Sequence, residues 1–391
     1  METAAILEES HVETQNREGR FRILVTKNLP GKRWVEIFAA NDCRVEIRNS
    51  RETIRAGELK AWIGDSCHGV VGQLTEDWNE ELLETLKTAG GRVYSSYAVG
   101  YNNVDIDAAS RLGIPVGNTP GILTDATAEL ATALTMAAAR RIVEGDNMVR
   151  RGDFTGWQPD LLLGTLLRGK TLGVVGAGRI GSAYARIMIQ AYRMNLVYFD
   201  RGPNEDLEMF IHDFNAFLVS RKEKPLECSY VADLDELLSN SDVVSIHTPL
   251  DKSTRHLINR ERFALMRRHA VFVNTSRGAV VDEQALVEHC RKNPDFRVGL
   301  DVFEFEPRLT EGLDTLSNVV LAPHLGSATR STREGMAVLA VRNVVGILNG
   351  WPVWDSDDME PFLSDVPPMA VPSIVNADRL HLPRYSTLHS V

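Results

Sequence analysis

The sequence predicts an α/β fold with a doubly wound parallel sheet and a second, smaller parallel sheet. Two observations support this prediction. Short apolar runs of strand length alternate with helix-length segments along most of the 391 residues. Within that alternation, residues 171–200 run through a strand, a glycine-rich turn, a helix, a second strand and an acidic residue. This is the order of a dinucleotide-binding βαβ unit, so it predicts where a cofactor binds.

The unit begins with a strand at residues 171–175, which leads into the pattern G-x-G-x-x-G at Gly176, Gly178 and Gly181. Gly176 permits the tight turn, Gly178 lets the backbone approach a pyrophosphate, and Gly181 lets the helix pack close to the sheet. The N–H groups and the positive dipole end at the helix start favour phosphate binding. Asp200 follows about 20 residues later, where a carboxylate accepts from ribose hydroxyls. The alternative is a glycine-rich turn in another kind of α/β sheet.

Asp200 also bears on the choice between the two nicotinamide dinucleotides. Its carboxylate repels the 2′-phosphate of NADP(H), so the sequence predicts a preference for NAD(H). The neighbouring Arg201 screens this charge. We therefore expect NADP(H) as a weaker alternative cofactor.

A first group of elements precedes this unit. Residues 1–20 are polar, and we expect them to be mobile. A helix is predicted over residues 76–87 from its apolar spacing. Strands are predicted at residues 21–26, 45–47, 69–71, from 93 onward and at 115–117. Together these elements predict the smaller parallel sheet.

The middle of the chain contains the longer elements. Residues 125–148 are rich in alanine and predict one long helix, which a glycine-punctuated arm follows. The extension at residues 206–224 is interpreted as a surface segment, and its F-x-x-x-F-x-x-F spacing leaves a helix as the alternative. Further strands are predicted at 243–246, 270–273, 298–300 and 319–321, with helices such as 232–238 and 283–290 between them.

The C-terminal part of the chain changes character. Residues 327–350 have helical periodicity. Residues 352–391 hold six of the sixteen prolines. This composition predicts an irregular, partly disordered tail with polyproline character.

Composition argues against several classes of protein. The formal net charge is −10 and no run of basic residues exceeds two, so we expect no nucleic-acid partner. No apolar stretch reaches the roughly 18–20 residues of a membrane span, so we expect no membrane partner. The four cysteines are far apart, which predicts reduced thiols in a reducing compartment and no metal site: Cys43, Cys67, Cys228 and Cys290.

The two ends of the sequence bear on its compartment. The N-terminus has neither the apolar core of a signal peptide nor an Arg-rich transit pattern, and the C-terminus reads HSV rather than S-K-L. We expect a soluble intracellular protein, with peroxisome, mitochondrion and cytosol all open.

Three segments after the cofactor unit carry residues suited to catalysis. They are VNTSRG with Arg277, GLDVFEFEP with Asp301, Glu304 and Glu306, and VVLAPHLGSAT with His324. Each follows a predicted strand, at the edge where ligands bind in open α/β sheets. An arginine grips the carboxylate of a 2-oxo acid, a histidine gives a proton to the developing alkoxide, and a carboxylate orients that histidine. This set predicts hydride transfer to a keto acid.

Each of these residues also has a structural interpretation. Alone, Arg277 is an ion-pair partner, the D-V-F-E-F-E-P segment is an acidic turn and His324 is a structural histidine. Their joint occurrence after a dinucleotide motif favours catalysis. Glu306 is the preferred partner of His324, and Glu304 competes because spacing alone does not separate them. Asp301 is expected nearer the nicotinamide.

The motifs GAGRIG, NTSRG, DVFEFEP and PHLGSAT together resemble the D-isomer-specific 2-hydroxyacid dehydrogenases. The resemblance covers residues 21 to about 372 and implies that Arg277, Glu306 and His324 are catalytic. It implies a flavodoxin-like substrate domain, residues 1–121 with 327–391, that holds an inserted Rossmann NAD-binding domain, residues 122–326. It implies that the cofactor site contains Gly176, Gly178, Arg179, Ile180, Gly181, Asp200, Thr248, Pro249, Thr275, Ser276, Arg277, Asp301, His324 and Gly326. It also implies a homodimer built through the helix at 125–148 and the arm.

Within this family the likeness is greatest to the plant-type hydroxypyruvate reductases, through segments such as GQLTEDW and AVGYNNVD. That likeness implies NADH-dependent reduction of hydroxypyruvate, with glyoxylate as a slower substrate. Besides Arg277 and His324, it implies that Val99 and Gly100 bind the substrate carboxylate through their N–H groups. Trp157 is expected to shape the partner's active site, with simple dimer packing as the alternative.

Two other functions remain open at this stage. One is another substrate within the family, such as 3-phosphoglycerate or a general 2-oxo acid. The other is a low-turnover NAD(H)-sensing protein like the corepressors that share this fold. A phosphorylated substrate would need extra cations near the VGYNNVD loop, and the sequence shows none there.

Overall fold

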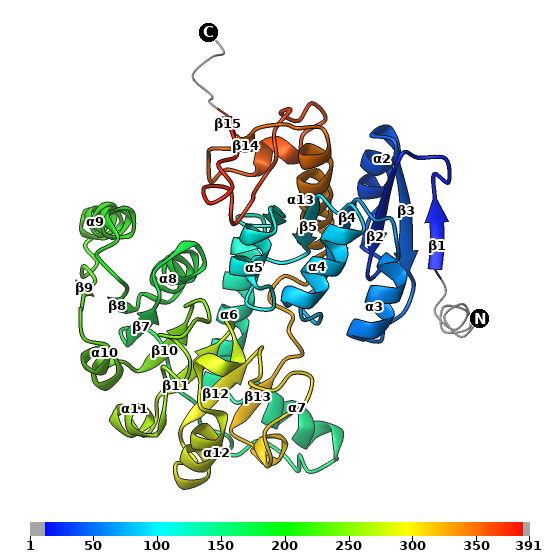
Figure 1. The fold of residues 1–391 in the computed structure, drawn as a ribbon. Coiled ribbons are helices and arrows are strands. Elements are labelled where there is room, and N and C mark those ends of the chain that lie inside the picture. Colours follow the sequence, from blue (N-terminus) through cyan, green and yellow to red (C-terminus); the bar gives the residue numbers. More distant parts are fainter. Residues whose placement is uncertain (1–11, 386–391) are drawn as a thin grey trace. The chain divides into compact units, whose positions relative to one another are not determined.

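The computed structural model describes residues 12–385 (Figure 1). The chain divides into two compact units. Unit 1 comprises Met1–Leu123 and Ala328–Val391, and unit 2 comprises Thr124–Ser327. The roles of these units as substrate domain and cofactor domain stay predictions.

Unit 2 is built on a seven-stranded parallel sheet of order β13-β12-β11-β10-β7-β8-β9. The order reverses between β7 and β10, as in doubly wound nucleotide-binding folds. The strands are β7 Thr171–Val175, β8 Asn195–Phe199, β9 Cys228–Tyr230, β10 Val243–Ile246, β11 Val271–Asn274, β12 Arg297–Leu300 and β13 Val319–Leu321. The predicted doubly wound α/β fold is confirmed.

Helices cover both faces of this sheet. One hydrophobic core lies under α10, α11 and α12, and the other under α6, α8 and α9. Because the sheet is buried on both faces, its strands consist of nearly continuous apolar residues. The helices of unit 2 are α6 Thr124–Ala139, α7 Ile142–Arg150, α8 Arg179–Tyr192, α9 Glu205–Ser220, α10 Leu234–Asn240, α11 Arg260–Leu265 and α12 Glu283–Lys292.

Unit 1 has a six-stranded sheet of order β1-β3-β2-β4-β5-β6, parallel except for β1 at one edge. The five parallel strands have the flavodoxin-like order. They are β2 Phe21–Val25, β3 Cys43–Arg48, β4 Gly69–Gly72, β5 Val93–Ser96 and β6 Val116–Gly117, and β1 is Val12–Gln15. The smaller parallel sheet that the sequence predicts is therefore present.

The helices of unit 1 also lie on both faces. One core lies under α3, α4 and α5, while α13 and α2 pack together on the other face. Most of α13 is buried, so it shows no polar stripe. These helices are α2 Arg33–Ala40, α3 Ala56–Ile63, α4 Glu80–Thr88, α5 Ile106–Arg111 and α13 Arg330–Leu348.

The single helix predicted at residues 125–148 is wrong, because the structure has two helices there. Arg141 adopts the left-handed conformation with φ 55° and separates α6 from α7. Its guanidinium binds Glu144 at 2.7 Å, which stabilises this turn. The arm then returns, and Thr165 N donates to the Ala139 carbonyl at 2.8 Å. Helix propensity alone does not reveal this break.

For residues 206–224 the structure shows the helix that the sequence left as an alternative: most of them form α9, and most residues of α9 are exposed at the surface. Asn204 caps the helix by accepting from Leu207 N at 2.9 Å. Leu207, Ile211 and Leu218 are buried, so α9 contributes to the core. Phe210 and Phe214 pack against the edge of this core, whereas Phe217 is 48% exposed. Each of the three lies within cation–π distance of an arginine.

Both polar ends of the chain contain more structure than the sequence predicts. Residues 12–15 form strand β1, paired antiparallel with β3, so the prediction of mobility fails there. In the tail, residues 352–385 are irregular as predicted but ordered, with Phe362 and Val371 fully buried. Residues 353–354 and 384–385 form the paired strands β14, Val353–Trp354, and β15, Arg384–Tyr385. Residues 1–11 and 386–391 lie outside the described residues.

Candidate functional site

The three glycines after β7 differ in their surroundings. Gly176 has φ 93°, and a Cβ there would lie 2.9 Å from the His247 backbone. A Cβ on Gly181 would lie 2.0 Å from the Gly176 carbonyl oxygen, so only glycine allows α8 to pack this close to β7. A Cβ on Gly178 would have no neighbour within 4 Å. The structure thus leaves open space at Gly178, where the pyrophosphate is expected.

Asp200 lies at the end of β8, close to this turn. Its Oδ2 accepts from Ala177 N at 2.8 Å, and its Oδ1 accepts from Arg201 N at 2.7 Å. The carboxylate is therefore held beside the glycine turn. The Arg201 side chain is exposed and forms no ion pair with Asp200 among the described residues.

Two threonines lie at the C-terminal ends of β10 and β11, beside the point where the strand order reverses. Thr248 Cγ2 approaches the Cβ position of Gly176 to 3.1 Å. The hydroxyls of Thr248 and Thr275 are buried and have no hydrogen-bond partner among residues 12–385. Buried hydroxyls are normally satisfied, so this pair indicates a missing polar ligand. With Gly178 and Asp200, they fit a dinucleotide.

His324 and Glu306 form the central contact of the site. His324 Nδ1 lies 2.9 Å from Glu306 Oε2. Because an ionised carboxylate only accepts, Nδ1 carries the proton and Nε2 is left for another partner. Burial alone raises the pKa of Glu306. The hydrogen bond and charge of His324, the Phe303 N–H and the Arg277 charge together hold that pKa below its ordinary value.

His324 is held by its backbone as well. It adopts the left-handed conformation with φ 56°, which is uncommon for a residue with a Cβ. Its N–H donates to the Asp301 carbonyl at 2.9 Å. The buried Asp301 carboxylate accepts from Leu325 N at 2.6 Å and from Gly326 N at 2.8 Å. Asp301 therefore fixes the loop that carries the imidazole, a role that the sequence did not indicate.

Arg277 follows β11 and is half-buried. Its Nη1 donates to the Ser276 carbonyl at 2.6 Å. Burial lowers the pKa of Arg277 from its ordinary value, and the Glu306 carboxylate opposes that shift. The guanidinium nevertheless stays charged at neutral pH, as arginine side chains do in proteins. The charges of Arg277 and Glu306 influence each other, so their two segments lie close together. Because Glu306 also contacts His324, all three predicted segments meet at one end of the sheet.

Glu304, the competing carboxylate, faces a different histidine. Its Oε1 lies 2.6 Å from His256 Nε2, and Arg255 also approaches it. Glu304 N in turn donates to Glu283 Oε1 at 2.7 Å, while Glu283 Oε2 accepts from the Thr310 hydroxyl. These contacts fix the segment before Glu306. Glu304 therefore pairs with His256, and Glu306 is the carboxylate that contacts His324.

Gly278 lets the segment with Arg277 meet the segment with Glu306. A Cβ on Gly278 would lie 1.9 Å from the Phe303 carbonyl carbon and 2.3 Å from Glu304 N. Sequence reasoning missed Gly278, Glu283 and His256. Glu283 was not predicted because it is the first residue of a helix, α12. The sequence signal that could have indicated it is its place directly after Asp282, the N-cap, in V-V-D-E-Q-A-L.

The remaining predicted residues lie elsewhere. Val99 and Gly100 are in unit 1, in the half-buried loop after β5, where Asn118 Nδ2 donates to the Val99 carbonyl at 2.9 Å. Trp157 is in the arm of unit 2, with 84% of its surface exposed. Their contacts with substrate or partner stay predictions.

Two general properties limit the chemistry. Across residues 12–385, no helix has both the length and the apolarity to cross a membrane. In the same part of the chain, no group of three or more His, Cys, Asp or Glu side chains is arranged to hold a metal ion. All four cysteines are free, and Cys228 alone among them is not buried.

The doubly wound sheet, the open glycine turn and the paired imidazole and carboxylate define a dinucleotide-dependent oxidoreductase. The family described as "D-isomer specific 2-hydroxyacid dehydrogenase, NAD binding domain" matches residues 132–326. The protein named glycerate dehydrogenase from Cucumis sativus is 51% identical over 373 residues, covering 94% of this chain and 98% of that protein. This chain belongs to the D-isomer specific 2-hydroxyacid dehydrogenases, a family of NAD-dependent enzymes.

Other relatives agree with this assignment. The glyoxylate reductase of Thermococcus litoralis is 44% identical, covering 84% of this chain and 94% of its own. A crystal structure titled D-lactate dehydrogenase from Aquifex aeolicus, complexed with NAD and lactic acid, has a TM-score of 0.69 and 28% identity. It covers 84% of this chain and 96% of the other. The predicted family and its NAD(H) cofactor are therefore confirmed.

Proposed function

We propose that this chain reduces hydroxypyruvate to D-glycerate with NADH, and glyoxylate to glycolate more slowly. The observation that carries the proposal is the contact between His324 Nδ1 and Glu306 Oε2, which orients an acid at the C-terminal edge of a dinucleotide-binding sheet. The names glycerate dehydrogenase and glyoxylate reductase among the relatives support these two substrates.

Each side chain has one task in this reaction. Bound NADH supplies the hydride. The Arg277 guanidinium binds the substrate carboxylate through its planar fork and polarises the adjacent ketone. His324 donates a proton from Nε2 to the oxygen as negative charge develops there. Glu306 stabilises the imidazolium and keeps Nε2 directed at the substrate.

The cofactor is held by the glycine turn and the strand ends. Gly178 leaves room for the pyrophosphate, Asp200 accepts from the adenosine ribose, and the hydroxyls of Thr248 and Thr275 bind polar groups of the dinucleotide. Because Asp200 repels a 2′-phosphate, NADPH serves only as a weaker alternative. The same site includes Arg179, Ile180, Pro249, Ser276, Asp301 and Gly326.

Unit 1 and the arm supply the remaining contacts of the proposal. The N–H groups of Val99 and Gly100 bind the substrate carboxylate. The enzyme is a homodimer in which α7 and the arm form the interface, and Trp157 lines the partner's site. The free thiols of all four cysteines support a reducing compartment.

A four-substrate assay tests this function. NADH oxidation is followed with hydroxypyruvate, glyoxylate and pyruvate, and NAD+ reduction with 3-phosphoglycerate. We expect the highest kcat/KM for hydroxypyruvate, then glyoxylate. A preference for pyruvate or for 3-phosphoglycerate would assign another substrate within the family. NADH binding without turnover of any of the four acids would contradict the enzyme and support an NAD(H)-sensing protein.

A further inference from the structure

A basic pocket lies in unit 1, lined by residues to which no role is assigned above. It is a hollow of about 390 Å³ lined by Lys27, Asn28, Arg48, Asn49, Ser50 and Arg51. Lys27 and Asn28 follow β2, and the other four residues form the end of β3 and the turn after it. The pocket thus lies at the C-terminal ends of two adjacent parallel strands, the edge where open α/β sheets bind ligands.

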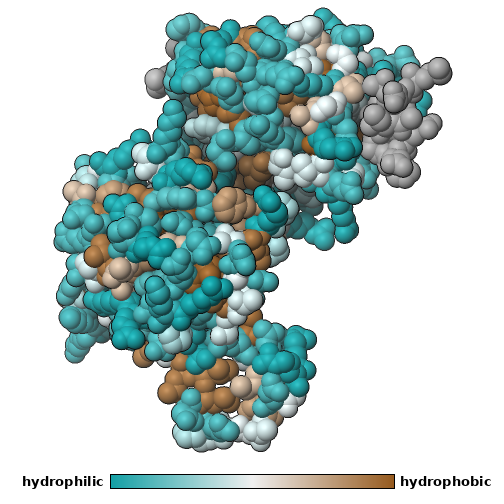
Figure 2. All heavy atoms as spheres, turned by 60° about the horizontal axis from the view of Figure 1, so that its bottom comes forward, coloured by the Kyte–Doolittle hydropathy of each residue, from teal (hydrophilic) through white to brown (hydrophobic). Residues whose placement is uncertain are grey.

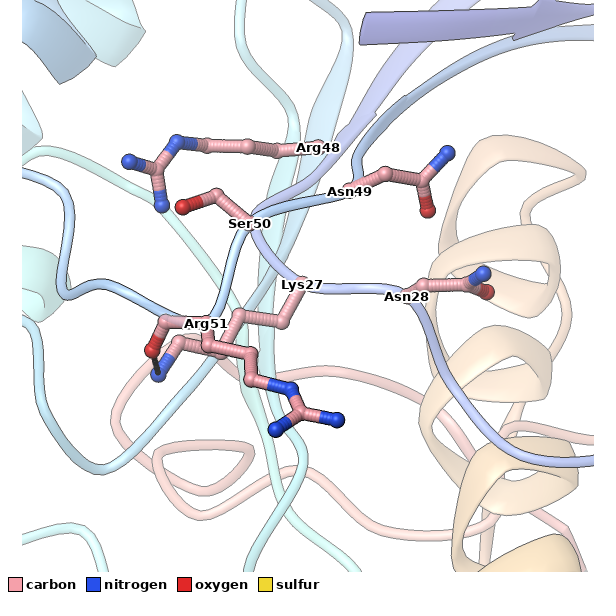
Figure 3. A pocket seen from close by; sticks show the side chains of 6 residues that line it. All are labelled: Lys27, Asn28, Arg48, Asn49, Ser50 and Arg51. Atoms are coloured by element: carbon pink, nitrogen blue, oxygen red, sulfur yellow. Dashed lines mark hydrogen bonds between the residues drawn. The ribbon is translucent and has the colours of Figure 1, made fainter. Parts of the chain in front are cut away.

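The side chains that line the pocket are linked to its backbone. Lys27 Nζ donates to the Arg51 carbonyl at 3.3 Å, and Asn28 N donates to the Arg48 carbonyl at 3.2 Å. Figure 3 shows the Lys27 and Arg51 side chains next to each other, with Arg48 and Ser50 extending in the same direction across the pocket. The first contact fixes the Lys27 ammonium beside the Arg51 backbone, and the three cationic residues line one hollow.

The three cations lack acidic partners. Across residues 12–385, no Asp or Glu side chain forms an ion pair with Lys27, Arg48 or Arg51. Arg48 is only 6% exposed, yet the one hydrogen bond that its side chain makes in that part of the chain goes to the Glu52 carbonyl at 2.6 Å. A buried guanidinium normally meets a carboxylate or a phosphate. The pocket is thus locally cationic in a protein of net charge −10.

Three carboxylates near the pocket form no ion pair with its cations in the described part of the chain. Glu13 Oε2 accepts from the lining residue Asn49, from its Nδ2, at 3.2 Å. Glu58 is engaged with Arg55, to which it is hydrogen-bonded at 2.7 Å. Glu76 is buried, and burial raises its pKa to about 7, although the charge of Lys27 opposes that shift. A carboxyl with this pKa is largely protonated at slightly acidic pH and only partly charged at neutral pH. The positive charge of the pocket is therefore available to a ligand.

We propose that this pocket binds the phosphate group of a small phosphorylated metabolite. Arg48 and Arg51 provide planar forks that match phosphate oxygens, and Lys27 adds a point charge between the two strand ends. The Ser50 hydroxyl, which extends in the same direction as Arg48 in Figure 3, adds a neutral donor for a remaining oxygen. The volume exceeds that of phosphate alone, so it leaves room for a short carbon chain. The proposal does not depend on the function proposed above, because binding is measured without turnover.

Calorimetric titration with inorganic phosphate tests the site, on full-length protein saturated with NAD+ so that its pyrophosphate site is filled. We expect wild-type protein to bind phosphate with a Kd on the order of 1 mM at low ionic strength. The double variant K27Q/R51Q should raise that Kd at least about tenfold. The matched control K87Q/R92Q removes two exposed cations elsewhere in unit 1 and should leave the Kd unchanged. Arg48→Lys keeps the charge but not the fork, and should weaken binding less than K27Q/R51Q.

The proposal is overturned if wild-type protein does not bind phosphate. It is equally overturned if K27Q/R51Q binds as wild type does, or if K87Q/R92Q loses as much affinity. Turnover then identifies the source of the phosphate. If K27Q/R51Q loses NAD+-dependent oxidation of 3-phosphoglycerate but keeps hydroxypyruvate reduction, the phosphate belongs to a substrate. If phosphate binds and 3-phosphoglycerate is not oxidised, it belongs to a separate ligand of the same site.

Discussion

At the scale of single residues, the imidazole of His324 is oriented by one carboxylate and by its own backbone. Glu306 binds Nδ1, and the Asp301 carbonyl accepts the His324 N–H. The Asp301 side chain meanwhile binds the next two N–H groups. Among residues 12–385, Nε2 of His324 has no hydrogen-bond partner, so this ring nitrogen is available to a substrate.

Substitution of this pair separates proton donation from cofactor binding. We expect His324→Ala to lower kcat by about 10²–10⁴-fold, because general acid catalysis contributes that much, while the Kd of NADH is unchanged. In Glu306→Gln the imidazolium loses its carboxylate, so kcat should fall while the Kd of NADH is unchanged. The exposed Glu311→Gln serves as control and should leave kcat unchanged. A wild-type kcat in Glu306→Gln would contradict the orienting role.

Glu76 is a second residue whose surroundings set its charge. Its Oε2 accepts from Gln73 N at 2.7 Å and from Trp78 Nε1 at 3.3 Å, while its Oε1 has no partner in the described part of the chain. Burial raises its pKa from the ordinary 4.5 to about 7. The folded protein therefore retains a proton on Glu76 that the unfolded chain releases at lower pH.

This raised pKa predicts a pH-dependent stability. Stabilisation by the protonated carboxyl is complete below about pH 4.5 and is lost as the pH rises through about 7. Glu76→Gln keeps the acceptor oxygen without the charge. We expect it to be more stable than wild type at pH 8, by up to about 3 kcal/mol, and similar at pH 4.5. Thermal unfolding from pH 4.5 to 8 measures this, with exposed Glu84→Gln as control. Parallel Tm curves for Glu76→Gln and wild type would refute it.

At the scale of elements, the three glycines of the β7–turn–α8 unit have different roles. Gly176 is required by its positive φ, and Gly181 by the approach of the Gly176 carbonyl to 2.0 Å from its Cβ position. Gly178 has an ordinary φ of −72° and open space around it. Two of the glycines therefore serve the fold, while the third serves the ligand.

A pair of alanine substitutions tests this division. Gly178→Ala should leave the Tm of the ligand-free protein unchanged but weaken NADH binding at least about tenfold, because the new methyl occupies pyrophosphate space. Gly181→Ala should lower the Tm of the ligand-free protein, since overpacking against the Gly176 carbonyl costs about 1–3 kcal/mol. If Gly178→Ala bound NADH as wild type does, the pyrophosphate would lie elsewhere.

The elements that the sequence predicted share one physical feature. Strands such as β7 and β10 are buried on both faces, so they are unbroken apolar runs bounded by polar residues. The predicted site residues lie in the segments after such strands, so the sequence could place Arg277, Glu306 and His324 at one edge of the sheet. Contacts between distant segments were not predictable. The break at Arg141 depends on the returning arm, and α9 depends on packing against α8.

At the scale of the whole molecule, a group of exposed apolar side chains needs a partner. The face drawn in Figure 2 is mainly hydrophilic, with hydrophobic residues gathered in separate places. In unit 2, α7 buries none of its residues, and the arm after it exposes several large apolar side chains. They are Ile142, Val143, Val149, Phe154, Trp157, Leu163 and Leu166. A contiguous segment this apolar is typical of a protein–protein interface.

The proposed homodimer predicts how this surface responds to charge. We expect sedimentation of the wild-type protein to give twice the chain mass of 43.5 kDa. The double variant V149D/L166D should sediment as a monomer, because each aspartate would be buried unpaired in the interface, at a cost of several kcal/mol. Val366→Asp is the matched control, since Val366 is 89% exposed but belongs to unit 1. A dimer that survives V149D/L166D, or that dissociates in Val366→Asp, would place the interface on another surface.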